Sequence, residues 1–309
     1  MKFLFYTDTH YKDNAPKGRL DNIMDSQFDE LKDILELSRE YEVDFLLHGG
    51  DFFDNRKPSH QLVVHLLDWF KLLHLPVYTV IGNHDLLGYN LDSVKNSGLG
   101  VLLESGAVEK VDEHLQWDDS KVVIKSVHST LEFEKQYIFD DRYKDYLKIV
   151  VSHNYVIPSE SMPFGFIHPK DIQTNADLVL CGHYHTSFDH IEGNTRWINP
   201  GSVSRWSTAD RNKLPQALLI EVTGQEYNIK YLPLKSAKPG SEIFDIELIE
   251  ANKQHDKDIE AFAKSLESVS FQAVDIESMI KQVGSEQAIE KPILDIILNK
   301  ITEAKEVLK

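Results

Sequence analysis

Carboxylate, imidazole and amide side chains follow five apolar segments of this 309-residue sequence, each at the point where the segment ends. The segments are FLFYT, VDFLLHG, VYTVIG, LKIVVS and ADLVLCG, and the side chains that follow them belong to Asp8 and His10, Asp51, Asn83 and His84, His153, and His183 and His185. A lone histidine or strand-end aspartate is most often a core residue, a turn or a cap. Five strand ends of the same kind indicate one shared site.

The stretch GNHD, residues 82–85, has a simpler interpretation when it is taken alone. Gly82 and Asn83 then form a turn, Asp85 caps the next helix, and His84 has no role. The other four strand ends change this interpretation. Asp8 and His10 are two positions apart, so their side chains point to the same side of an extended chain.

This set of donors suits a pair of first-row divalent metal ions. One carboxylate shared by both ions, a second carboxylate, several neutral imidazoles and an amide oxygen complete the two coordination shells. Two ions about 3.5–4 Å apart activate a water and hold phosphoryl oxygens, which is metal-assisted phosphoester hydrolysis. Cys181 is the single cysteine, so a thiolate zinc site is disfavoured.

Helical patterns alternate with the apolar segments in the first half of the chain, the order that is typical of α/β proteins. Amphipathic helices are predicted from about Leu20 to Tyr41 and over residues 60–73. After Gly98 the segments become shorter and strand-like, and a two-sheet core with outer helices accommodates both halves. Because loops converge at the carboxyl ends of strands, we expect the five strand ends to meet.

A boundary is predicted at KSAKPGSE, residues 235–242, from its Lys, Ser, Pro and Gly content. It separates a domain over 1–235 from a smaller one over 236–309. The smaller domain has one strand-like run, IFDIELI, and two helical stretches, about 256–268 and 292–308. The last stretch has an apolar stripe that fits either the core of this domain or the docking of a partner, formed by Ile293, Leu294, Ile297, Leu298 and Ile301.

Charge and composition limit the function and the compartment. The net charge of -17, from 33 basic and 50 acidic residues, argues against a general electrostatic grip on nucleic acid but leaves a local one open. The N-terminus MKFLFYTDTH is a poor signal peptide, and no run of about 18 apolar residues predicts a membrane span. A single cysteine fits a reducing compartment, so we expect the cytoplasm.

The motifs D-x-H, G-D, G-N-H-[DE], H and G-H-x-H occur here in this order, and with them residues 1 to about 205 resemble the calcineurin-like metallophosphoesterase superfamily. The resemblance implies an α/β fold, α+β by some schemes. This fold is a four-layer, two-sheet sandwich with outer helices, followed here by a small α/β capping domain.

The resemblance also implies a role for each residue of the site. Asp8, His10 and His185 would hold one metal ion, and Asn83, His153 and His183 the other. Asp51 would bridge the two ions. His84 would lie outside the ligand set, where it orients the phosphate and helps to protonate the leaving oxygen.

Two further segments, GGDFFDNRKPS and INPGSVSR, resemble the nuclease branch of the superfamily, the SbcD-type subunits of bacterial and phage recombination complexes. This implies a DNA phosphodiester as substrate, manganese as the metal, and an SbcC-like ATPase with a long coiled coil as partner. The partner would then contribute much of the DNA affinity, which makes the acidic charge understandable. The resemblance further implies a homodimer formed by helices near GNHD, where HQLVVHLLDWF offers apolar side chains that core burial explains equally well.

Candidate DNA contacts lie in three basic loops and in the loop after VVIKSV, and each of them fits a solvated loop equally well. They are Lys12, Lys17, Arg19, Arg56, Lys57, Arg205, Arg211, Lys213 and His128. Trp206 either stacks on a base or packs into the protein. The contact assigned to His128 depends on analogy with the nucleases alone.

Two alternative functions stay open at this point. A metallophosphoesterase acting on a small phosphoester or phosphoprotein keeps the metals but requires an enclosed pocket in place of an open groove with basic or aromatic loops. A non-catalytic scaffold that binds DNA ends or an ATPase is disfavoured because every expected ligand and His84 are present.

Overall fold

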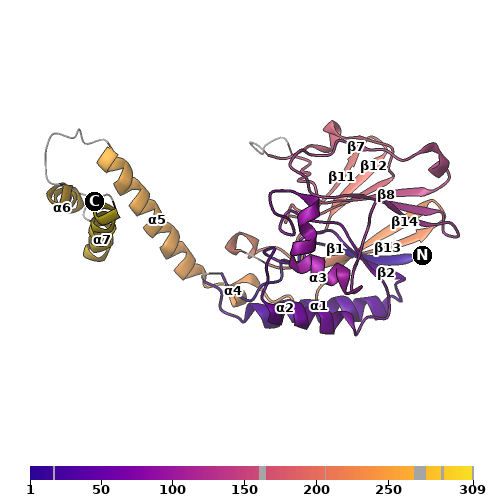
Figure 1. The fold of residues 1–309 in the computed structure, drawn as a ribbon, viewed down its shortest axis with the longest axis horizontal. Coiled ribbons are helices and arrows are strands. Elements are labelled where there is room, and N and C mark those ends of the chain that lie inside the picture. Colours follow the sequence, from indigo (N-terminus) through magenta and orange to yellow (C-terminus); the bar gives the residue numbers. More distant parts are fainter. Residues whose placement is uncertain (17, 160–164, 206, 268–275, 287–288, 308–309) are drawn as a thin grey trace. The chain divides into compact units, whose positions relative to one another are not determined.

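The computed structural model describes the chain apart from residues 17, 160–164, 206, 268–275, 287–288 and 308–309. It forms two compact units, Met1–Phe244 and Asp245–Lys309 (Figure 1). Residues 236–244, which composition assigned to the second domain, lie in the first unit. No helix in the described part of the chain combines the length and the apolar character that crossing a bilayer requires.

Two six-stranded sheets form the first unit. The first sheet has the order β14-β13-β1-β2-β3-β4, from Glu226–Pro233, Gln216–Thr223, Lys2–Tyr6, Phe45–His48, Val77–Thr79 and Glu109–Lys110. The second has the order β11-β12-β10-β8-β6-β5, from Phe188–Glu192, Thr195–Asn199, Leu178–Cys181, Leu147–Ser152, Val122–Val127 and His114–Trp117. The predicted α/β fold with two sheets is thereby confirmed.

Side chains of the central strands point alternately to the two faces of the sheet, which explains the apolar layers on both sides of it. In β1, Phe3 and Phe5 pack into the cluster between the two sheets, whereas Leu4 and Tyr6 belong to the cluster under the helices. Successive side chains of a strand point to opposite faces, so a strand that is apolar throughout is buried on both. All four side chains are fully buried, as this pattern requires.

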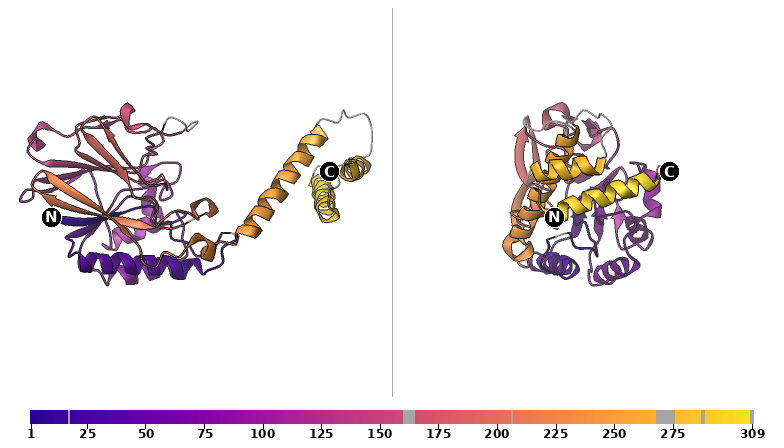
Figure 2. Two further views of the ribbon diagram at one scale, coloured as in Figure 1. Left: turned by 180° about the vertical axis from the view of Figure 1, so that it is seen from behind. Right: turned by 90° about the vertical axis from the view of Figure 1, so that its left-hand side faces the viewer.

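Helices cover the outer face of the first sheet. They are α1 (Ile23–Glu40), α2 (His60–Phe70) and the short α3 (Gly98–Glu104). Asn22 and Ser59 cap α1 and α2 with side-chain oxygens that accept from backbone N–H groups. Figure 2 shows α1 and α2 side by side under the sheet, and both contribute to the apolar cluster there.

The outer face of the second sheet has a different cover. Among the described residues it packs against the two-stranded ribbon of β7 (Gln136–Tyr137) and β9 (Gln173–Thr174) and against loops, including the 3-10 helix η2 (Asp141–Tyr143). A second 3-10 helix, η3 (Pro169–Asp171), precedes β9. The predicted outer helices are therefore α-helices on one side of the sandwich only.

Three further short elements complete the first unit. They are the 3-10 helices η1 (Leu91–Asn96) and η4 (Thr208–Asp210) and the helix α4 (Gly240–Ile243). The strand predicted over IFDIELI is wrong, because α4 ends at Ile243 and helix α5 begins at Ile246. A short apolar run does not distinguish a strand from a buried helical turn by its period.

The described part of the second unit consists of the helices α5 (Ile246–Glu267), α6 (Ile276–Glu286) and α7 (Lys291–Val307). Helix α6 was not expected from the sequence. A side chain at Gly284 of α6 would collide with Leu294 of α7, so these helices approach closely at that point. The stripe of α7 is half-buried along its length, which favours a role in the core of this unit.

Candidate metal centre

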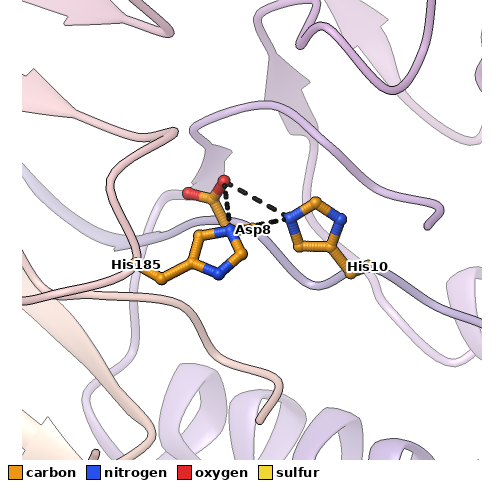
Figure 3. Close-up of side chains that lie close together, drawn as sticks. All are labelled: Asp8, His10 and His185. Atoms are coloured by element: carbon orange, nitrogen blue, oxygen red, sulfur yellow. Dashed lines mark hydrogen bonds and ion pairs between the residues drawn. The ribbon is translucent and has the colours of Figure 1, made fainter. Parts of the chain in front are cut away.

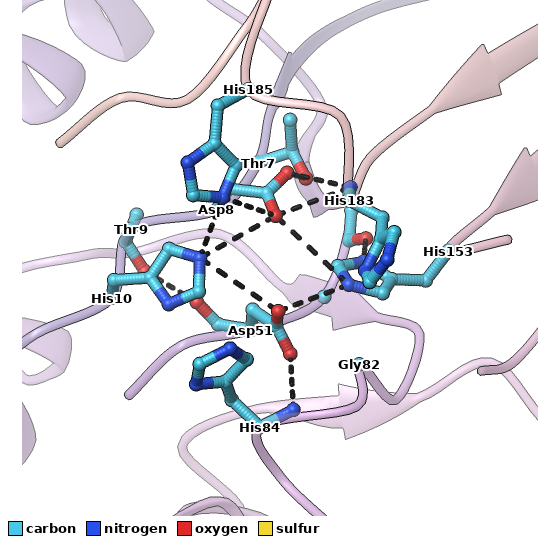
Figure 4. A network of polar contacts seen from close by, with 12 residues as sticks. Thr7, Asp8, Thr9, His10, Asp51, Gly82, His84, His153, His183 and His185 are labelled. Carbon is cyan, nitrogen blue, oxygen red and sulfur yellow. Dashed lines mark hydrogen bonds and ion pairs between the residues drawn. The ribbon is translucent and has the colours of Figure 1, made fainter. Parts of the chain in front are cut away.

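The predicted site forms where the carboxyl ends of parallel strands from both sheets meet. Strands β1, β2 and β3 are parallel neighbours in the first sheet, and β6, β8, β10 and β12 are parallel neighbours in the second. The loops after four of these strands bring together six predicted ligands, which Figure 4 draws with His84 and their polar contacts: Asp8, His10, Asp51, His153, His183 and His185.

Asp8, His10 and His185 form the first group (Figure 3). The Nε2 atoms of His10 and His185 lie 3.0 Å apart, and the Oδ1 atom of Asp8 lies 3.6 Å from each. Three donor atoms thus face one small volume from two sheets. An oxygen and two imidazole nitrogens in this arrangement fit a first-row divalent ion.

Asp51, His153 and His183 form a second group with ligand atoms within 4.8 Å of one another. The Oδ2 atom of Asp51 lies 3.1 Å from Nε2 of His153 and 3.7 Å from Nε2 of His10. This carboxylate oxygen therefore lies between the two groups (Figure 4). A bridging ligand needs this position.

Hydrogen bonds to the protein hold several of these side chains in place. Nδ1 of His153 donates to the carbonyl of Gly49 at 2.6 Å, which leaves Nε2 as the ligating atom. The hydroxyl of Thr7 donates to Oδ2 of Asp8 at 2.6 Å. The backbone N–H of His183 donates to the same carboxylate at 3.0 Å.

Four predicted ligands have a left-handed backbone, which non-glycine residues rarely adopt. The φ angles are 55° for Asp8, 42° for His10, 59° for Asp51 and 67° for His183. Such a conformation costs about 1–3 kcal/mol for each residue and persists only where the surrounding structure enforces it. Strain shared by four residues of one cluster is a mark of a functional site.

Two glycines permit the close approach of the loops. A side chain at Gly82 would collide with the carboxylate and backbone of Asp51, and one at Gly50 would collide with the ring of His153. Gly50 also has a φ of 101°, a conformation that favours glycine. The glycines before Asp51 and Asn83 are therefore part of the site.

Electrostatics favours ionised carboxylates at Asp8 and Asp51 and neutral imidazoles at His183 and His185, whereas the pKa values of His10 and His153 are raised. Burial acts to raise the pKa of Asp8, but the hydrogen bond from His10 and the charges of His153 and neighbouring imidazoles outweigh it and hold that pKa well below its usual range. Burial lowers the pKa of His183 to about 4. The pKa of Asp51 is lowered chiefly by His153, whose own pKa rises to about 10 in return, against the effect of burial on both.

The stretch GNHD lies against Asp51. The backbone N–H of His84 donates to Oδ1 of Asp51 at 2.9 Å, and its ring lies edge-on to that of His10 with the centroids 4.7 Å apart. Nδ1 of His84 is 2.5 Å from the carbonyl of Asp54, so it carries a proton and leaves Nε2 for a substrate. The Oδ1 atom of Asn83 is buried and has no hydrogen-bond partner among the described residues, as suits an oxygen that ligates a metal.

Asp85 has a role that the sequence did not predict. Its Oδ2 atom accepts from the backbone N–H of Gly82 at 2.9 Å and from that of Asp51 at 3.3 Å, so it joins the loops after β2 and β3. Burial, together with the charge of Asp51, raises its pKa to about 7. Its place in GNHD was the available signal, but the interpretation as a helix cap does not hold, because no helix begins at this point.

The basic residues predicted to contact DNA differ in exposure. The side chain of Arg19 is buried, forms an ion pair with Asp21 at 2.6 Å and donates to the carbonyl of Arg205 at 2.8 Å. Arg205 is itself buried. These two arginines have structural roles, because buried side chains do not reach a duplex.

Lys12 is also largely buried, with its Nζ atom 3.7 Å from a carboxylate oxygen of Asp54. Lys57 is exposed, and Arg56 and Arg211 are half-buried. These three remain open to a substrate. Lys17 and Trp206 lie outside the described residues.

His128 lies directly behind the GNHD loop. Its Nδ1 atom accepts from the backbone N–H of Ile81 at 3.2 Å. Burial lowers its pKa to about 4, so it is neutral. The side chain that was predicted to contact the substrate thus supports the end of strand β3 and does not line the depression beside His183 and His185.

An open depression of about 420 Å³ adjoins the cluster. It is lined by Tyr155, His183, Tyr184, His185 and Lys213. The sequence did not predict the two tyrosines as functional residues, although Tyr184 stands inside GHYH and Tyr155 follows His153 closely. Both lie on ligand-bearing loops, and this position was the available signal.

Comparison with known proteins decides the family. The model of the calcineurin-like phosphoesterases matches residues 1–187, which include all of the predicted ligands. The chain belongs to the calcineurin-like phosphoesterase family. This confirms the predicted family, which is one of metal-dependent phosphoester hydrolases. The fold agrees with a dimetal phosphatase from Danio rerio at a TM-score of 0.51 and 12% identity, over 75% of this chain and 96% of that one.

Within the calcineurin-like phosphoesterases, the chain is similar to proteins of double-strand break repair. It is 21% identical to the double-strand break repair protein MRE11 of Encephalitozoon cuniculi, over 77% of this chain and 48% of that protein. It is 24% identical to the SbcD subunit of the nuclease SbcCD from Staphylococcus saprophyticus, over 82% of this chain and 72% of that protein. The chain spans less than half the length of the MRE11 proteins that it matches.

Proposed function

We propose that this protein hydrolyses phosphodiester bonds of DNA with two divalent metal ions, and that it acts as an SbcD-like nuclease in recombination and repair. The observation that carries the proposal is the position of the Asp51 carboxylate between two groups of ligands that come from both sheets. One group would be completed by Asp8, His10 and His185. The other would be completed by Asn83, His153 and His183.

The ions would supply Lewis-acid activation of the attacking water and charge stabilisation of the phosphoryl oxygens. We take manganese as the metal, as in the sequence-based prediction. The protein contributes rigidity. The left-handed ligands, the hydrogen bond that Thr7 donates and those that the Gly49 carbonyl and the Asp85 carboxylate accept fix the donor atoms before a substrate arrives.

His84 would act on the substrate directly. With Nδ1 donating to the carbonyl of Asp54, its Nε2 atom is free to orient a phosphoryl oxygen and, when protonated, to donate to the leaving oxygen. The ring also contacts His10, which keeps it beside the cluster. It would thus serve as the general acid of the reaction.

The choice of DNA over a small phosphoester has two supports. Relatives with similar sequences are named for double-strand break repair or as part of a nuclease. The depression beside the cluster is open and has aromatic and basic walls, whereas a small-molecule enzyme would enclose its substrate. Lys57, Arg56, Arg211 and Lys213 are predicted basic contacts that are exposed or half-buried.

We also propose an SbcC-like coiled-coil ATPase as partner, a cytoplasmic location and a homodimer. The region 236–309 would serve for capping or partner binding. Exposed apolar side chains on α2 and α3, among them Val64 and Val101, support the homodimer. A net charge of -17 supports a division of labour in which the partner supplies much of the DNA affinity.

The test is cleavage of end-labelled linear double-stranded DNA with Mn²⁺, comparing the wild type with Asp51→Asn and with Asp68→Asn, a change of an exposed aspartate on α2. We expect cleavage by the wild type and by Asp68→Asn, and none by Asp51→Asn or after chelation of the metal. If the wild type hydrolyses bis(p-nitrophenyl) phosphate but leaves DNA intact, alone and with the ATPase, the substrate is a different phosphoester.

A further inference from the structure

Two tyrosine rings stand beside the candidate metal centre. Tyr155 comes two positions after His153, and Tyr184 lies between His183 and His185. Both rings are half-buried and line the open depression. The residues that hold the metals in the proposed function therefore carry an aromatic surface on the same loops.

The rings form a corner. The Tyr155 ring stands edge-on to His183, with centroids 4.6 Å apart and an interplanar angle of 83°. Its centroid lies 5.9 Å from that of Tyr184 at an angle of 65°. Two faces inclined in this way leave room for a flat group to stack on one ring and meet the edge of the other.

The backbone around Tyr184 is fixed. Its carbonyl accepts from Nδ2 of the buried Asn199 at 2.7 Å, and its N–H donates to the carbonyl of Gly182 at 2.8 Å. Lys213, whose ammonium pairs with Asp210 at 2.5 Å, lines the same depression beside His185. A rigid aromatic corner with a cation beside it suits a planar group attached to a phosphate.

We propose that Tyr155 and Tyr184 form a stacking subsite for an unpaired nucleobase next to the bond that is cleaved. The proposal rests on the proposed nuclease function and adds to it the form of the substrate. A volume of about 420 Å³ lies within the usual range of ligand sites, roughly 300–1,000 Å³. Stacking on tyrosine accepts any base, since every base has a π face.

The form of the substrate follows from the stacking. A base that stacks on a protein ring has left the stack of the duplex, so the strand that is cut must be single-stranded or frayed at that nucleotide. We therefore expect faster cleavage of single strands and of mismatched ends than of fully paired ends. The sequence of the cleaved strand has little influence.

The test uses the full-length chain with Mn²⁺ and single-stranded oligonucleotides in which one nucleotide at a time is replaced by an abasic residue. For the wild type, kcat/KM falls about 5- to 100-fold when the abasic residue occupies one defined position relative to the cleaved bond. In Tyr155→Leu and Tyr184→Leu, the ratio of kcat/KM for the intact substrate to kcat/KM for the abasic substrate falls towards one. Tyr155→Phe and Tyr184→Phe keep the ring and keep the ratio.

The matched control is Tyr231→Leu, which removes a tyrosine of β14 outside the depression and keeps the wild-type ratio. The subsite is overturned if the abasic substrates are cut as well as the intact one, or if the leucine variants keep the wild-type ratio. Absence of all oligonucleotide cleavage by the wild type, alone and with the ATPase partner, with hydrolysis of bis(p-nitrophenyl) phosphate retained, contradicts the proposed function itself and the subsite with it.

Discussion

At the scale of single residues, a change of His84 distinguishes the predicted catalytic role of this side chain from metal binding. In His84→Ala we expect phosphodiester hydrolysis to fall by about 10²- to 10⁴-fold, the usual contribution of a general acid, while Mn²⁺ binding is retained. His74→Ala, which changes an exposed histidine, is the control. The checks are the rate with bis(p-nitrophenyl) phosphate and the Mn²⁺ content of each variant. Loss of a metal ion together with the rate would make His84 a ligand.

Asp85 accepts from two backbone N–H groups beside the predicted ligands, and we predict that it positions them for metal binding. We expect Asp85→Ala to weaken Mn²⁺ binding about 10- to 100-fold, the usual effect of removing a group that supports a ligand. Asp85→Asn keeps an acceptor oxygen for Gly82 and Asp51 and should recover most of the affinity. Isothermal titration with Mn²⁺ measures both. Equal affinities in the alanine variant and the wild type would refute this role.

The convergence of the predicted ligands was predictable from the sequence because these residues stand at fixed points relative to strand ends. The burial of Arg19 and Arg205 was not predictable, since it depends on Asp21 and on loops far apart in the chain. A basic loop residue has the same appearance in a sequence whether it faces water or an ion pair. Tyr155 and Tyr184 were overlooked for a related reason, because tyrosine beside a histidine is common in cores.

At the scale of elements, His48 shows how β2 is adapted to its buried position. Nδ1 of His48 accepts from the N–H of Gly50, and its other nitrogen lies 3.2 Å from the hydroxyl of Thr9. Burial lowers its pKa to about 3. The imidazole is therefore a neutral, hydrogen-bonded core residue of the folded protein.

The low pKa of His48 predicts a loss of stability in acid. The unfolded chain takes up a proton below about pH 6.5, whereas the folded chain does so only near pH 3, so stability falls as the pH drops through this window. Between pH 7 and pH 5 the contribution is about 2 kcal/mol. Urea unfolding of wild type and His48→Asn in EDTA measures it. Equal pH dependence in the two proteins would show that His48 is protonated when folded.

Helices were predictable where the periodic pattern of apolar residues extends over many positions, and strands were predictable where both faces are buried. Helices α1 and α2 begin at the capping residues Asn22 and Ser59 and follow the predicted patterns closely. The strand predicted over IFDIELI failed because Ile246 and Ile249 fit a helical face as well as a strand. Local pattern alone does not decide between them.

At the scale of the whole molecule, the net negative charge of the chain bears on how the candidate metal centre would meet a phosphodiester. In the proposed function, cations held by Asp8 and Asp51 would offset part of the local negative charge, which would otherwise oppose the approach of a phosphodiester. The first unit contains every predicted ligand. On the proposed function, residues 1–244 would therefore supply the metal chemistry, and DNA specificity and the ATPase contact would involve surfaces beyond the centre.

The central claim is that one carboxylate joins two metal positions, and the number of bound ions tests it most directly. We would dialyse the wild type, Asp51→Ala and the exposed-site control Asp68→Ala against Mn²⁺ and measure the metal bound to each chain. The account predicts two ions for the wild type and for Asp68→Ala, and fewer than two for Asp51→Ala at the same free Mn²⁺. A single ion in the wild type, or two retained by Asp51→Ala, would contradict it.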